Sequence, residues 1–183
     1  MDKIKVAAGI ASAVMLMGSA YTFFNMPVSA NEPKTSYIEC LGRVRTVDEI
    51  AEINALAKML WGEARGVKST TEKAACVWVV LNRVDDERWP DNVIDVLEQP
   101  LQFGGYSYKF PVEDWARELA ADVYDRWTDE RETGQDAGRV IPEDYFYWRG
   151  EKGCKHNWFR KVFDDYSGET YTFELESPYE DWQ

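Results

Sequence analysis

Two consecutive helices with apolar surfaces are predicted by residues 56–84, and this stretch constrains the fold more than any other part of the chain. Just before it, Thr46-Val47-Asp48-Glu49 forms a capping box, in which a Thr and a Glu three residues later satisfy each other's free backbone donors. A first helix should therefore begin near Val47. Apolar residues recur three and four positions apart up to Ala64, and Gly66 is expected to end the helix.

A second helix is predicted to follow almost at once and to form the core of the domain. Ser69-Thr70-Thr71-Glu72 repeats the capping-box pattern, and residues 74–84 are apolar on nearly every side. Such a helix must be covered all round by other elements. A chain of 183 residues is long enough to bury this core in a single domain without disulfide bonds.

One carboxylate, Glu63, is predicted to lie on the apolar side of the first helix. It follows Leu56, Met59 and Leu60 at helical spacing, although charged side chains usually lie in solvent. Apolar surroundings disfavour the ionised form of a carboxyl group, which lets it keep a proton near neutral pH and donate it to a leaving oxygen. A Glu beside Arg65 in the last helical turn could equally be a surface residue in an ion pair, and the pattern alone leaves both interpretations open.

The remaining elements predict an α+β fold that is mostly helical and ends in a small antiparallel β lobe. Residues 31–45 are expected to be a connector, and residues 46–183 a single domain. Further helices are expected at 93–98, capped by Asp91 or Asn92, and at 112–131. The strands are expected at 145–148, 157–163 and 170–175.

The 112–131 helix is predicted to be amphipathic scaffold. Its apolar face includes Trp115, and its acidic residues should form a solvated face: Glu113, Asp114, Glu118, Asp122 and Asp125.

The first thirty residues are predicted to direct the chain out of the cytoplasm. Lys3 and Lys5 precede an apolar run at residues 6–24, and Val28-Ser29-Ala30 has the small residues of a signal cleavage site. Cleavage after Ala30 is expected. The apolar run is also long enough to span a bilayer, so an uncleaved signal-anchor is the alternative. In both cases the domain would work outside the cytoplasm.

Charge and cysteine content narrow the function further. A net charge of −12 excludes nucleic acid as a partner, because phosphate contacts need a basic surface, and it predicts repulsion from other anionic polymers. Of the three cysteines, Cys76 is expected to be a buried free thiol, while Cys40 and Cys154 could form a bridge. His156 is the only histidine, which excludes most zinc-hydrolase ligand sets, and neither a cofactor nor a metal is predicted.

Several motifs, in order, resemble the SleB-like (spore-cortex-lytic) family of bacterial and phage cell wall hydrolases. They are WGEARG at 61–66, VLNRV at 80–84, Trp89-Pro90, Gln99-Pro100 and Gln102-Phe103. The resemblance implies that residues 46–183 form a lysozyme-like catalytic domain acting on peptidoglycan. A monomer is expected. It implies cleavage of the β-1,4 bond between N-acetylmuramic acid and N-acetylglucosamine, typically as a lytic transglycosylase.

The same resemblance implies that Glu63 is the catalytic acid and base, with no second carboxylate required. Ordinary glycoside hydrolysis would use two carboxyl groups, and the candidate partners are Asp85, Asp86, Glu87, Asp91 and Asp95. Five further residues are expected to contact the sugars, with turn formation or packing as the alternative for each: Gln102, Phe103, Tyr106, Tyr147 and Trp158.

Two other functions are left open by the sequence. The segment GETYTF at 168–173 lacks the histidine usual in the family's last strand, so the chain could be a catalytically weak relative that only binds peptidoglycan. A muramidase-type phage lysis enzyme is the other alternative.

Overall fold

Helix α2 (Thr70–Asp85) lies at the centre of the fold, as its sequence predicts. The computed structural model describes residues 37–150, 157–163, 177–179 and 182, and in it every residue from 74 to 83 is buried. The Ser69 hydroxyl caps the helix by accepting a hydrogen bond from the Glu72 amide. The predicted second half of this capping box is wrong, because the Glu72 carboxylate instead accepts from the backbone amide of Asn157, at 2.9 Å.

Helix α1 (Val47–Met59) begins at the predicted capping box, where Thr46 and Glu49 exchange both hydrogen bonds. Its expected continuation as an α-helix to Ala64 is wrong. From Leu60 the chain forms a π-helix, η1 (Leu60–Ala64), which ends before Gly66. A π-turn holds one more residue than an α-turn and is most often found at functional sites. Because of this extra residue, Glu63 points in a different direction from the one it would have in a regular α-helix.

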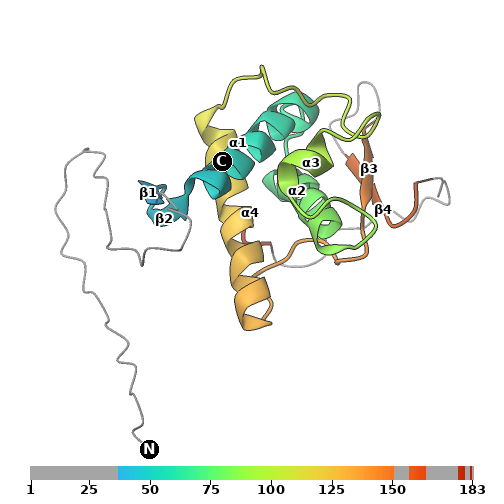
Figure 1. Cartoon of the computed structure of the whole chain (residues 1–183). Coiled ribbons are helices and arrows are strands. Elements are labelled where there is room, and N and C mark those ends of the chain that lie inside the picture. Colours follow the sequence, from blue (N-terminus) through green and yellow to red (C-terminus); the bar gives the residue numbers. More distant parts are fainter. Residues whose placement is uncertain (1–36, 151–156, 164–176, 180–181, 183) are drawn as a thin grey trace, which may run out of the picture.

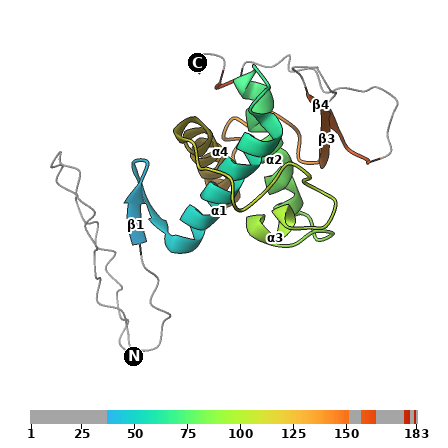
Figure 2. The ribbon, with the colours of Figure 1, turned by 90° about the horizontal axis from the view of Figure 1, so that it is seen from above.

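Two further helices complete the helical core (Figures 1 and 2). Helix α3 (Val93–Leu97) is capped by Asn92 and packs against α1 and α2. Helix α4 (Asp114–Thr133) starts two residues later than expected, packs against the same two helices, and ends at Gly134 in the left-handed conformation. In the described ranges, no helix has the length and apolar composition needed to cross a membrane; residues 1–30 lie outside those ranges.

Parts of the predicted pattern for α4 are wrong. Asp125 is not simply solvated, because Arg45 binds both of its carboxylate oxygens, at 2.6 and 2.9 Å. Asp122 accepts hydrogen bonds from Arg126 and from the hydroxyl of Tyr179. Trp115, expected in the core, is 37% exposed. These acidic residues attach the hairpin and the end of the chain to the helical core.

The predicted connector before α1 instead contains a β-hairpin of strands β1 (Tyr37–Cys40) and β2 (Arg43–Thr46). Leu41 and Gly42 form its turn, both with positive φ, as a two-residue hairpin turn requires. Cys40 is a free thiol, so the suggested bridge to Cys154 is not formed, and Cys154 itself lies outside the described residues. Cys76 is a buried free thiol as predicted, and burial raises its pKa.

A second antiparallel sheet lies at the opposite end of the helical core from the hairpin (Figures 1 and 2). It pairs β3 (Tyr147–Gly150) with β4 (Asn157–Arg160) and places Trp148 opposite Phe159. The predicted third strand, at 170–175, lies outside the described residues. The helical core with small antiparallel sheets confirms the predicted α+β class.

The ion pair between Arg45 and Asp125 should hold the hairpin to α4. The Arg45 side chain is almost fully buried, so R45A would leave a half-buried Asp125 without its main partner. We expect R45A to lower the free energy of unfolding by about 2 kcal/mol in denaturant titrations. The matched control is R43A: the Arg43 side chain is 45% exposed, and its loss should cost less than about 1 kcal/mol. Equal losses for the two variants would contradict this account.

Candidate active site

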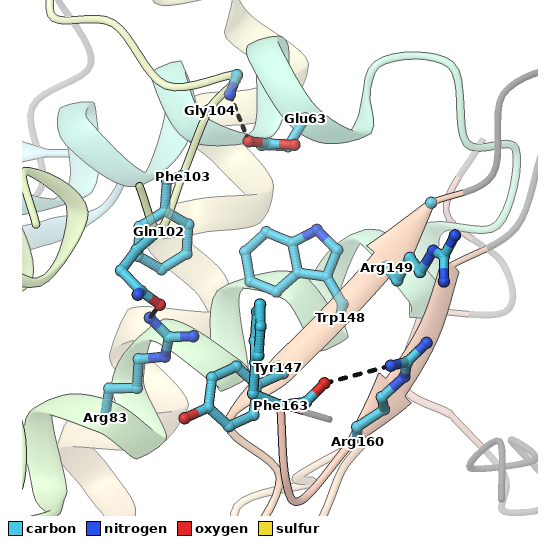
Figure 3. A pocket seen from close by; sticks show the side chains of 12 residues that line it. Glu63, Arg83, Gln102, Phe103, Gly104, Tyr147, Trp148, Arg149, Arg160 and Phe163 are labelled. Carbon is cyan, nitrogen blue, oxygen red and sulfur yellow. Dashed lines mark hydrogen bonds between the residues drawn. The ribbon is translucent and has the colours of Figure 1, made fainter. Parts of the chain in front are cut away.

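A pocket of about 470 Å³ lies between η1, the loop at 102–105 and the second sheet (Figure 3). Glu63 enters it from the helical side. Aromatic and cationic side chains come mainly from strands β3 and β4 and from Phe163, which lies three residues after β4. The described residues that line it are Glu63, Arg83, Gln102, Phe103, Gly104, Gly105, Tyr147, Trp148, Arg149, Gly150, Arg160 and Phe163. Its volume is within the usual range for ligand sites.

The half-buried carboxylate of Glu63 is held in place by the loop opposite it. The Gly105 backbone N–H donates a hydrogen bond to Glu63 Oε1 at 2.6 Å. Two glycines allow this close approach. A Cβ atom on Gly62 would lie 1.7 Å from the Gly105 carbonyl oxygen, and one on Gly105 would lie 2.7 Å from Glu63 Cδ. The loop therefore lies directly on the π-helix and fixes one oxygen of the carboxylate.

Arg83 connects α2 to the 102–105 loop and to the segment that leads into β3. Its Nε donates to the Phe146 carbonyl at 2.8 Å, and its Nη1 donates to Gln102 Oε1 at 3.1 Å. The buried guanidinium also lies over the aromatic rings of Trp89, Phe103 and Tyr147, 4.4–4.9 Å from their centroids. Burial lowers the pKa of Arg83 to about 10, which still leaves it protonated at neutral pH.

Asn82 fixes the segment that leads into β3. Its amide nitrogen donates to the carbonyl oxygens of Pro142 and Tyr145, both at 2.9 Å, and its amide oxygen accepts from Arg139. Asn82 and Arg83 are the polar residues of the VLNRV motif. Both are buried at the end of an otherwise apolar helix, and their hydrogen bonds compensate for the loss of water.

The structure brings four of the six predicted site residues together and leaves two outside the pocket. Glu63, Gln102, Phe103 and Tyr147 line it. Tyr106 packs half-buried against the core, and Trp158 lies on β4 opposite Arg149; neither lines the pocket. Contact of any of these residues with sugar stays a prediction.

Several lining residues were not among the predicted site residues. Trp148 packs beside Phe103, with 5.4 Å between ring centroids, and Phe163 packs beside Tyr147. Arg149 and Arg160 come from adjacent strands. Arg83 was part of a recognised motif, whereas Trp148, Arg149 and Arg160 lie on β3 and β4, whose pairing residue spacing does not reveal.

None of the five candidate partners for a second carboxylate lines the pocket: Asp85, Asp86, Glu87, Asp91 and Asp95. Asp85 accepts from the Trp127 indole, Asp86 binds Arg88, and Asp95 belongs to the cap of α3. Among the described residues, Glu63 is the only carboxylate that lines the pocket. Over the same part of the chain, no three His, Cys, Asp or Glu residues form a group that could hold a metal ion.

The close approach of the loop to the π-helix should be essential for activity. G62A places a methyl group against the Gly105 carbonyl, which must displace the loop and its hydrogen bond to Glu63. We expect about a hundredfold loss of the peptidoglycan-lysing activity that the resemblance implies, measured by turbidity, with a destabilisation of about 1–3 kcal/mol. G66A is the matched control, because nothing lies within 4 Å of its added Cβ. Wild-type activity in G62A would show that the loop position is not needed.

Comparison with known proteins identifies the family. A family model described as Cell Wall Hydrolase matches residues 68–166, just over half of the 183-residue chain. The match begins after Glu63 and includes α2 with Asn82 and Arg83, the 102–105 loop, β3 and β4. No curated protein and no solved structure matches the chain. Because the match covers more than half of its length, the chain belongs to the Cell Wall Hydrolase family, whose role is the degradation of peptidoglycan.

Proposed function

We propose that the protein cleaves the β-1,4 bond between N-acetylmuramic acid and N-acetylglucosamine as a lytic transglycosylase. The observation that carries this proposal is the isolation of Glu63 in the pocket. No second carboxylate lines the pocket in the described part of the chain, whereas ordinary glycoside hydrolysis uses a pair. A transglycosylase needs only one, because the same side chain acts first as acid and then as base.

Glu63 performs two proton transfers in this mechanism. Its Oε1 accepts from the Gly105 N–H, so the acid proton is carried by Oε2. Oε2 gives this proton to the glycosidic oxygen as the bond from that oxygen to muramoyl C1 breaks. The carboxylate then takes the proton of the muramoyl C6 hydroxyl while O6 bonds to C1. The products are a free sugar hydroxyl and a 1,6-anhydro ring, and no water is consumed.

Other lining residues suit the orientation of a glycan strand. Arg83 binds the side-chain oxygen of Gln102, so the NH2 group of Gln102 is left to donate to an acceptor such as an N-acetyl carbonyl. Tyr147, Trp148 and Phe163 offer aromatic surface to the apolar faces of sugar rings. On this proposal, Tyr106 and Trp158 would contact only sugars bound beyond the pocket.

Export follows from the proposed substrate. Peptidoglycan lies outside the cytoplasmic membrane, and residues 1–30 have the basic start, apolar run and small residues of an export segment. We propose that the domain works on the outer side of the membrane, either released by cleavage after Ala30 or held by residues 6–24.

Replacement of Glu63 by Gln should abolish catalysis without removing the hydrogen bond from Gly105, since an amide oxygen also accepts. We expect E63Q to lower the rate of peptidoglycan solubilisation by about a thousandfold while it still binds sacculi. E87Q is the control, because Glu87 is exposed and lies outside the pocket. Lysis by E63Q at the wild-type rate would exclude Glu63 as the acid, and binding by a wild type that does not cleave would favour the binding-module alternative.

The products distinguish transglycosylation from hydrolysis. Mass spectrometry of digested peptidoglycan should show muramoyl ends that are lighter by one water than the reducing ends left by a muramidase. Digestion in water enriched in the heavy oxygen isotope should leave these ends unlabelled, because O6 and not water attacks C1. Reducing ends that carry the label would show hydrolysis and would require a second catalytic group.

A further inference from the structure

Two arginines in the sheet wall of the pocket have no role in the proposed mechanism. Arg149 and Arg160 both line the pocket. Figure 3 shows their guanidinium groups together on the side of the pocket away from Arg83 and Gln102. The side chain of Arg149 is exposed and makes no hydrogen bond or ion pair with any residue in the described ranges. Its charge is therefore open to a ligand.

The charge of this wall contrasts with that of the whole chain. The protein carries a net charge of −12, yet in the part of the chain that the structure describes, the charged residues that line the pocket are three arginines and Glu63. Arg83 is occupied by its contacts to Phe146 and Gln102, and Arg160 donates to the Phe163 carbonyl, so the exposed Arg149 is the arginine that offers its positive charge to the open side of the pocket. An acidic protein is repelled by an anionic cell wall, and a local cationic surface provides attraction at one defined place.

Guanidinium groups bind carboxylates through paired, charge-assisted hydrogen bonds. Peptidoglycan has such carboxylates beside its glycan strand. The stem peptides carry them, and the lactyl group of N-acetylmuramic acid becomes one where the stem has been removed. We propose that Arg149 binds a peptidoglycan carboxylate next to the cleaved bond and so selects strands by their peptide substitution. This inference rests on the proposed function, because it takes peptidoglycan as the ligand of the pocket.

Binding measurements in a cleavage-deficient background test this inference separately from catalysis. Cosedimentation with sacculi would compare E63Q with E63Q/R149A. The control is E63Q/K68A, which removes one exposed positive charge outside the pocket. Each protein would be tested on sacculi with intact stems, on sacculi whose carboxyl groups have been amidated, and on amidase-treated sacculi with free lactyl carboxylates.

We expect R149A to weaken binding about tenfold on a carboxylate-bearing form of the sacculi and to have no effect on the amidated form. R149K should recover part of the loss, because Lys keeps the charge but not the paired donors. The difference should shrink as salt is added, since Arg149 is exposed. Circular dichroism would verify that each variant is folded.

The substrate forms identify the source of the carboxylate. A loss on intact sacculi alone indicates stem carboxylates, and a loss on stem-free sacculi alone indicates the lactyl group; both support the inference. An equal loss on amidated sacculi, or no loss on any form, overturns it. If the E63Q variant still lyses the wall, the proposed role of Glu63 is refuted and the binding result is unaffected. If R149A lyses the wall normally and binds as tightly as its parent, only the inference about Arg149 is refuted.

Discussion

The contact between the 102–105 loop and the π-helix is the interaction on which the site depends. It needs no side chain at Gly62, none at Gly105, and a π-turn that presents Glu63 to the loop. A backbone N–H is a rigid donor, so its bond to Glu63 Oε1 fixes the carboxylate more firmly than a flexible side chain would. The remaining polar residues of the pocket then position substrate around a group that is already oriented.

Helix α2 supports this arrangement because two buried polar residues, Asn82 and Arg83, follow its apolar stretch. A buried cation without partners would cost several kcal/mol, on the order of the total stability of a small domain. Arg83 offsets this cost with two hydrogen bonds and three aromatic rings, and Asn82 uses both ends of its amide. These partners belong to the loop and to the segment entering β3. Folding of the core therefore also assembles two walls of the pocket.

The sequence predicts this structure where local interactions decide it. The Thr46 capping box fixes the start of α1, and the apolar run of α2 can only be buried, so both helices were confirmed. The π-turn at Leu60–Ala64 was not predicted, because one extra residue in a single turn barely alters the apolar spacing. The hairpin before α1 was missed since its strands are only four residues long, and Arg149 reaches the pocket through pairing with β4.

Glu63 is the one pocket carboxylate in the described ranges, and on the proposed route water and the C6 hydroxyl compete to give it a proton. Both are oxygen nucleophiles, and either could give its proton to Glu63 once the glycosidic bond has broken. The C6 hydroxyl belongs to the same sugar, so it has the advantage of proximity over a water that must be captured from solvent. Phe103, Tyr147, Trp148 and Phe163 add to that advantage, since aromatic surface holds water weakly and a bound glycan would displace it. The aromatic wall would thus favour ring closure over hydrolysis, with no need for a second acid.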